Sequence, residues 1–223
     1  VAEGALGAYL NEDLAELGIT VDAAPVLDLP AAGADPVIGD RAWGTDPARV
    51  ARLGRAVCEG LLAGGVLPII KHIPGHGRGR VDSHKALPRV DDEHAALAQA
   101  DFAPFRALAH MPWAMTAHIV YTAIDDAAPA TLSRIVIENV IRSEIGFDGV
   151  LVSDDIAMGA LAGSFAERTR RALDAGVDLV LHCNGDIREM EEVAASARVL
   201  RPQAQARVMR AEQLVQLYQK DPD

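Results

Sequence analysis

The sequence has little cysteine, few aromatic residues and no excess of basic residues. Its 223 residues include two cysteines and 4% aromatic side chains, and the formal net charge is −11 at pH 7. So acidic a chain argues against nucleic acid or an anionic membrane surface as a partner, because both require a basic face. Cys58 and Cys183 lack the spacing of a disulfide framework, which is typical of a reducing compartment.

Long apolar runs and nucleotide-binding loops are also missing. No run approaches the ~20 apolar residues of a membrane span, and the first residues lack the basic, apolar and small-residue order of a secretion signal. No GxGxxG or Walker loop follows any predicted strand, which excludes the usual nucleotide cofactors. We therefore expect a soluble, cytoplasmic, monomeric protein that needs no cofactor.

Short apolar segments alternate with segments of helical periodicity. Strands are predicted over 19–29, 66–70, 113–121, 149–156 and 177–183, and helices over 1–18, 47–63, 91–109, 132–144, 165–175, 186–199 and 202–219. This order predicts parallel β/α units in one α/β domain. Polar residues collect at the C-terminal ends of all the strands, where parallel folds place their sites. So many polar strand ends favour a (β/α)8 barrel over a doubly wound sheet.

The loop after the second predicted strand is rich in titratable residues. The sequence KHIPGHGRGRVDSH contains Lys71, His72, His76, Asp82 and His84. A structural loop needs glycine and proline for its turns, but it does not need these side chains. The concentration therefore indicates a functional site, although a surface loop with exposed histidines is the alternative.

Asp82, Ser83 and His84 form the first candidate catalytic group. In an extended loop, residues two apart point to the same side, so we expect Asp82 to bind one ring nitrogen of His84. The other nitrogen is then free for proton transfer, which makes His84 a candidate general acid/base. Ser83 should point the opposite way, and without a Gly-x-Ser-x-Gly elbow a serine hydrolase is not expected.

Two acidic residues end the fourth predicted strand. Successive strand residues face opposite sides, so only one of Asp154 and Asp155 can face a barrel mouth, and the other is structural. The alternative is that both are ordinary capping carboxylates. Arg41, Lys71 and His72 supply cations and donors that suit a substrate rich in hydroxyl groups or carrying a carboxylate. Salt bridges in the barrel wall are the alternative for these three residues.

A zinc site is one competing hypothesis. His72, His76, His84 and His118 could bind zinc together with a nearby aspartate, as in a metallohydrolase. Their spacing matches no standard ligand set, and we expect no metal.

Four segments carry a family resemblance: IGDRAWGTDP, KHIPGHGRGRVDSHKALP, AHIVY and GVLVSDDIAMGAL. In their order and spacing they resemble glycoside hydrolase family 3, and in particular its bacterial β-N-acetylglucosaminidases of cell-wall recycling. The resemblance implies retaining hydrolysis that releases terminal N-acetylglucosamine from muropeptide fragments. It assigns Asp154 as nucleophile, His84 as acid/base and Asp82 as its partner.

The same resemblance places Arg41, Lys71 and His72 against the terminal sugar and gives Asp155 the structural role. Family members carry a further segment ahead of this start, with an Asp-Gln-Glu-Gly-Gly motif and three barrel strands. We therefore expect 1–223 to be an N-terminally incomplete catalytic barrel domain of about five β/α units. A β-glucosidase, a phosphorylase and a sugar-binding or structural fragment without activity remain open.

Overall fold

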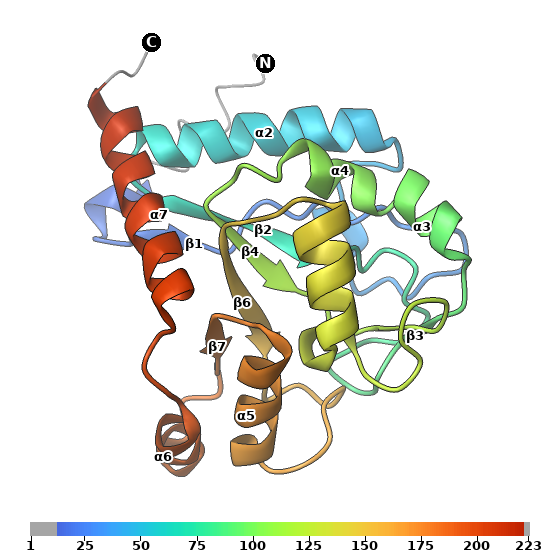
Figure 1. Ribbon diagram of the computed structural model, residues 1–223. Coiled ribbons are helices and arrows are strands. Elements are labelled where there is room, and N and C mark those ends of the chain that lie inside the picture. Colours follow the sequence, from blue (N-terminus) through green and yellow to red (C-terminus); the bar gives the residue numbers. More distant parts are fainter. Residues whose placement is uncertain (1–12, 221–223) are drawn as a thin grey trace.

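The protein is built on a curved sheet of five parallel strands in the order β1-β2-β4-β6-β7 (Figure 1). The structure, a computed structural model, describes residues 13–220. All neighbouring strands pair in parallel, so their C-terminal ends lie along one edge. This sheet confirms the predicted α/β fold of TIM-barrel type. The strands are β1 (Val21–Asp22), β2 (Leu67–Ile73), β4 (Trp113–Thr116), β6 (Val150–Asp155) and β7 (Leu179–Leu181).

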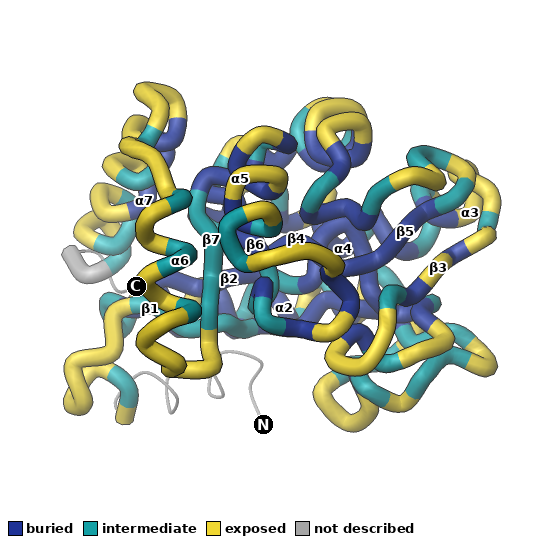
Figure 2. Tube along the Cα trace, turned by 90° about the horizontal axis from the view of Figure 1, so that it is seen from below, coloured by how far each residue is buried: buried dark blue, intermediate teal, exposed yellow. Residues whose placement is uncertain are grey.

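The two faces of the sheet carry different apolar sets, because alternate strand residues point to opposite sides. Ile69, Met115 and Val152 form a small cluster on one face, which we call the inner face. Ile70 and Leu151 belong to the main core, on the face that the helices cover. Figure 2 shows that β2, β4 and β6 are mostly buried, whereas the outward turns of the helices are exposed.

Several helices begin and end where the sequence predicts. Asp46 caps α2, with Pro47 at its first position, and its side chain accepts the Arg49 N–H at 2.9 Å. A capping box starts α5 at Ser164, and Gly176 ends it with a φ of 119°. The helices are α2 (Pro47–Ala63), α3 (His94–Gln99), α4 (Phe102–Ala107), the π-helix η3 (Val136–Glu144), α5 (Phe165–Ala175), α6 (Ile187–Ser196) and α7 (Pro202–Lys220), with short 3-10 turns η1 (Gly39–Arg41) and η2 (Ala130–Leu132).

The single helix predicted over 91–109 is wrong. It is divided into α3 and α4 near Asp101, whose buried carboxylate accepts a hydrogen bond from Arg78 Nε at 2.7 Å. Pro104, in the first turn of α4, has no N–H to donate to the Ala100 carbonyl, so a continuous helix cannot form here. Most of the helix predicted over 1–18 lies outside the described residues.

Two predicted strands are interrupted in the structure. The segment 19–29 forms only β1 and an isolated bridge between Val26 and Lys71, since Pro25 has no N–H to continue a ladder. The segment 113–121 divides into β4 and β5 (Val120–Tyr121), which pairs with β3 (Arg89–Val90) in a second small sheet. Among residues 13–220, no helix is both long and apolar enough to cross a membrane.

Candidate active site

A cavity of about 220 Å³ lies at the C-terminal ends of β2, β4 and β6. It brings together five of the six residues predicted for the site, and Asp82 lies next to it as the partner of His84. Its polar lining consists of Arg41, Lys71, His72, His76, Ser83, His84 and Asp154.

Asp154 faces this cavity because it continues the inner face of β6, two residues after Val152. Its side chain is 16% exposed. The Asp155 carboxylate instead accepts the backbone N–H groups of Ala157 at 2.9 Å and Cys183 at 3.2 Å. The two side chains therefore point to opposite sides, as strand alternation predicts. Asp154 faces the cavity, and Asp155 accepts hydrogen bonds from the backbone.

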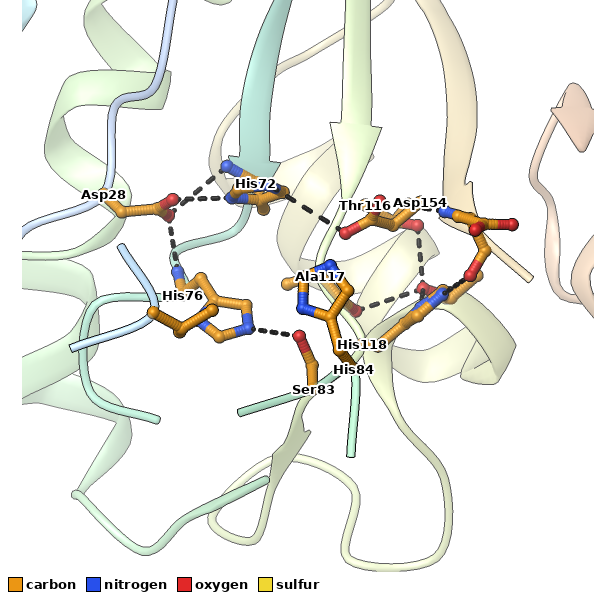
Figure 3. Close-up of polar contacts among 12 residues, drawn as sticks. Asp28, His72, His76, Ser83, His84, Thr116, Ala117, His118 and Asp154 are labelled. Carbon is orange, nitrogen blue, oxygen red and sulfur yellow. Dashed lines mark hydrogen bonds and ion pairs between the residues drawn. The ribbon is translucent and has the colours of Figure 1, made fainter. Parts of the chain in front are cut away.

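His72 connects the cavity to a buried carboxylate on the segment after β1 (Figure 3). Its Nδ1 lies 2.6 Å from Asp28 Oδ2, and its Nε2 lies 3.9 Å from Asp154 Oδ2. Burial acts to raise the pKa of the Asp28 carboxyl, but His72 and the His76 N–H at 2.6 Å together hold that pKa below its ordinary value. An ionised Asp28 only accepts hydrogen bonds, so the proton is on His72 Nδ1 and Nε2 is directed towards Asp154.

Asp82 and His84 form the predicted pair. His84 Nδ1 lies 2.8 Å from Asp82 Oδ1, and the same oxygen accepts the His84 backbone N–H at 2.9 Å. These two hydrogen bonds lower the pKa of Asp82. The extended loop predicted for this segment is wrong. The segment is a turn, in which the Lys85 N–H donates to the Asp82 carbonyl at 2.9 Å. The His84 side chain is 62% exposed, so its Nε2 remains accessible.

Lys71 and Arg41 give the cavity its positive charge. Burial lowers the pKa of the Lys71 ammonium, Asp154 acts in the opposite direction and Arg41 lowers it further. Within the described part of the chain, Lys71 Nζ forms no hydrogen bond or ion pair. Arg41 is exposed and donates from Nη2 to the Val37 carbonyl at 2.7 Å. Both cations therefore keep donors for a ligand.

The sequence did not predict the supporting roles of three buried polar residues, Asp28, His76 and Ser83. Asp28 holds both His72 and His76, and the His76 Nε2 lies 3.1 Å from Ser83 Oγ. The one available signal for Asp28 was a carboxylate within the otherwise apolar segment PVLDL. No comparable signal indicated that Ser83 and His76 meet.

The histidines do not assemble a metal site with one another or with other described residues. His118 places Nε2 at 3.0 Å from the Asp155 carbonyl and Nδ1 at 2.7 Å from Thr131 Oγ1, so both nitrogens are occupied. Over residues 13–220, no group of three or more His, Cys, Asp or Glu side chains converges to hold a metal ion. The zinc hypothesis therefore has no ligand set in this part of the chain.

Two of the larger hollows, of about 420 and 730 Å³, lie beside Arg207, away from these residues. The Arg207 guanidinium is buried there, and it already binds Asp148 and Asp178. The charge of this arginine is therefore balanced within the protein, so Arg207 does not mark either hollow as a catalytic site.

A curved parallel sheet with a carboxylate and an Asp–His pair at its C-terminal edge has the construction of a barrel enzyme. The family described as "Glycosyl hydrolase family 3 N terminal domain" matches residues 4–216. The chain belongs to glycoside hydrolase family 3.

Individual relatives agree with this family. The chain is 43% identical over 183 residues to a protein named Beta-hexosaminidase from Alkalilimnicola ehrlichii, a match that covers 80% of this chain and 52% of the relative. It thus spans about half the length of this curated relative. A family 3 β-N-acetylglucosaminidase from Paenibacillus sp. superposes with a TM-score of 0.86 and 34% identity, over 97% of this chain and 43% of that one.

A third relative was solved with a sugar derivative. NagZ from Neisseria gonorrhoeae, in complex with N-trifluoroacetyl-D-glucosamine, superposes with a TM-score of 0.84 and 36% identity. The superposition covers 97% of this chain and 64% of that one.

Proposed function

We propose that the protein containing this chain is a retaining β-N-acetylglucosaminidase, with Asp154 as nucleophile and His84 as acid/base. The observation that carries this proposal is that Asp154 and His84 line one cavity while Asp82 fixes one nitrogen of the His84 ring. The relatives named Beta-hexosaminidase support the same reaction.

In the first step, an oxygen of Asp154 attacks the anomeric carbon and the bond from that carbon to the leaving oxygen breaks. The His84 imidazolium gives its Nε2 proton to the leaving oxygen. Asp82 only accepts at Nδ1, so the neutral ring that remains has its free lone pair on Nε2. The product of this step is a glycosyl ester on Asp154.

In the second step, water adds to the anomeric carbon and the ester bond to Asp154 breaks. His84 Nε2 takes the proton from the water, which restores the imidazolium. Asp82 keeps the ring in one tautomer throughout, so the same nitrogen serves as acid and then as base.

The terminal sugar occupies the cavity beside Arg41, Lys71 and His72 in this proposal. The free Lys71 ammonium donates to sugar hydroxyl oxygens. His72, held at Nδ1 by Asp28, presents Nε2 to the same ligand. The natural substrate we propose is a muropeptide fragment with a terminal N-acetylglucosamine, cleaved by a monomer in the cytoplasm during cell-wall recycling.

The test uses the complete protein that contains this chain. We expect release of N-acetylglucosamine from a 4-nitrophenyl β-N-acetylglucosaminide and from N-acetylglucosaminyl-anhydromuramyl peptide, with the β-anomer formed first. No release from either compound, or the α-anomer formed first, contradicts the proposal.

The same assay in phosphate buffer tests whether phosphate replaces water as the acceptor. A neutral imidazole, unlike a second carboxylate, does not repel an anionic acceptor, so phosphate could replace water in the second step. Formation of a sugar 1-phosphate at the expense of free sugar in phosphate buffer would make the protein a phosphorylase.

A further inference from the structure

Ser83 lies between Asp82 and His84 in sequence, but its side chain is turned into the protein. It is 3% exposed, whereas the His84 side chain is 62% exposed. Ser83 Oγ lies 3.1 Å from His76 Nε2, on the segment that leaves β2 (Figure 3). Its carbonyl oxygen accepts the Ala160 N–H at 3.1 Å. One residue thus ties the Asp82–His84 turn to the segments that follow β2 and β6.

Gly159 allows the turn to approach the segment after β6. Its N–H donates to the His84 carbonyl at 3.1 Å. A Cβ atom at this position would lie 2.7 Å from the His84 oxygen and 3.0 Å from the Lys85 oxygen. The first contact is shorter than real Cβ atoms show and the second is unusually tight, so a side chain here would force the turn away from β6.

We propose that Ser83 and Gly159 are positioning residues that dock the Asp82–His84 turn against the end of β6, which carries Asp154. The docking sets where His84 Nε2 lies relative to Asp154. Its catalytic consequence rests on the proposed function, but the docking itself is a property of the loop and can be measured without substrate.

The Ser83–His76 hydrogen bond suits a permanent anchor. A hydroxyl can both donate and accept, so the bond forms with either neutral tautomer of His76. Burial lowers the pKa of His76, which keeps the ring neutral near pH 7. In contrast, Arg80, Val81 and Lys85 around the anchor are exposed, so the turn depends on the attachments of Ser83 and His84 for its place.

The direct test is amide hydrogen exchange of the complete protein, read at Gly159 and Ala160. Their N–H groups donate to the turn, so they exchange when it undocks. We expect Ser83→Ala to speed both amides about fivefold, the effect of losing one ordinary hydrogen bond. The matched control is Ser143→Ala, whose Oγ donates to the Glu138 carbonyl at 2.8 Å within η3 and which should leave both amides unchanged.

Kinetics separate positioning from simple stabilisation. Ser83→Ala should lower kcat for the muropeptide substrate about five- to tenfold while KM stays within about twofold, because only His84 is displaced. A dinitrophenyl leaving group needs little protonation, so its release in the first turnover should be nearly unaffected. Gly159→Ala should show the same pattern with a larger loss.

The possible outcomes test the docking of the turn, the positioning role of Ser83 and the proposed glycosidase function separately. Unchanged exchange at Gly159 and Ala160 in Ser83→Ala overturns the docking. Faster exchange with an unchanged kcat for the muropeptide overturns the positioning role. Faster exchange in a protein whose wild type cleaves neither glycoside supports the docking and contradicts the proposed function.

Discussion

His72 Nδ1 lies 2.6 Å from Asp28 Oδ2, and the two residues are 44 positions apart in the sequence. Asp28 is fully buried, and His72 is nearly so. The same carboxylate accepts the His76 backbone N–H at 2.6 Å. Asp28 therefore holds the start of the loop that continues to Asp82 and His84, and we expect it to matter for stability as well as for the site.

Asp28→Ala should lower the free energy of unfolding by about 3–5 kcal/mol, because it leaves His72 and a buried N–H without their partner. The measurement is urea unfolding of the complete protein. Asp174→Ala is the control: its 65% exposed carboxylate pairs with Arg198 at the surface, and its loss should cost about 1 kcal/mol or less. Equal losses in the two variants would contradict a structural role for Asp28.

The order of strands and helices could be predicted from the sequence, and so could the opposite orientations of Asp154 and Asp155. Both depend on local rules. Strand alternation separates Asp154 from Asp155, and capping chemistry locates Asp46 and Gly176. The contact between Asp82 and His84 was also predicted, since two residues so close in sequence meet in a turn as well as in an extended loop.

What the sequence could not predict depends on contacts between distant segments. The salt bridge between Asp101, which lies where the helix predicted over 91–109 divides, and Arg78 on the loop after β2 is one such contact. The support of His72 by Asp28 joins two strand ends that become neighbours only in the sheet. The approach of Gly159 to the Asp82–His84 turn is a steric relationship that no local pattern encodes.

The buried His118 should make stability depend on pH. Burial lowers its pKa in the folded protein, while an unfolded chain binds the proton with a pKa of about 6.5. The unfolded state therefore binds more protons, and the free energy of unfolding should fall as the pH drops below about 6.5. The slope is at most about 1.4 kcal/mol per pH unit for each such histidine, and His76 contributes in the same direction.

His118→Gln provides the check. The substitution should lower the free energy of unfolding at pH 7.5. It should also reduce the slope of that free energy against pH between pH 6.5 and 5, because unfolding then takes up one proton fewer. Urea unfolding at several pH values measures both effects. Parallel curves for the variant and the wild type would mean that His118 does not titrate differently in the two states.

Asp154→Ala should reduce turnover of an aryl β-N-acetylglucosaminide by about 10⁴-fold or more, as expected for loss of a nucleophile. Added azide should restore part of the activity and give the α-glycosyl azide. Asp155→Ala should chiefly lower stability, by about 1–3 kcal/mol, because two backbone N–H groups lose their acceptor. Azide rescue of Asp155→Ala but not of Asp154→Ala would reverse the two roles.

Lys71→Met keeps the apolar stem and removes the ammonium group. Loss of a charge-assisted hydrogen bond should weaken binding of N-acetylglucosamine roughly ten- to hundredfold. Calorimetric titration of the complete protein measures this affinity, and thermal unfolding shows whether the fold is retained. An unchanged affinity in a folded variant would remove Lys71 from the sugar site.

Asp82→Asn and His84→Ala together test the acid/base pair. Asp82→Asn keeps the size of the side chain but lets the amide favour the wrong tautomer of His84, so turnover should fall about 10²- to 10⁴-fold.

In His84→Ala, the first step should slow more for a muropeptide than for a dinitrophenyl glycoside, whose leaving group needs little protonation. The second step needs the base whichever group has left, so the glycosyl ester on Asp154 should accumulate with the activated substrate. Rapid mixing should then show a burst of dinitrophenol, and mass spectrometry should find the adduct on Asp154. An equal loss for both substrates, without burst or adduct, would show that His84 is not the acid/base.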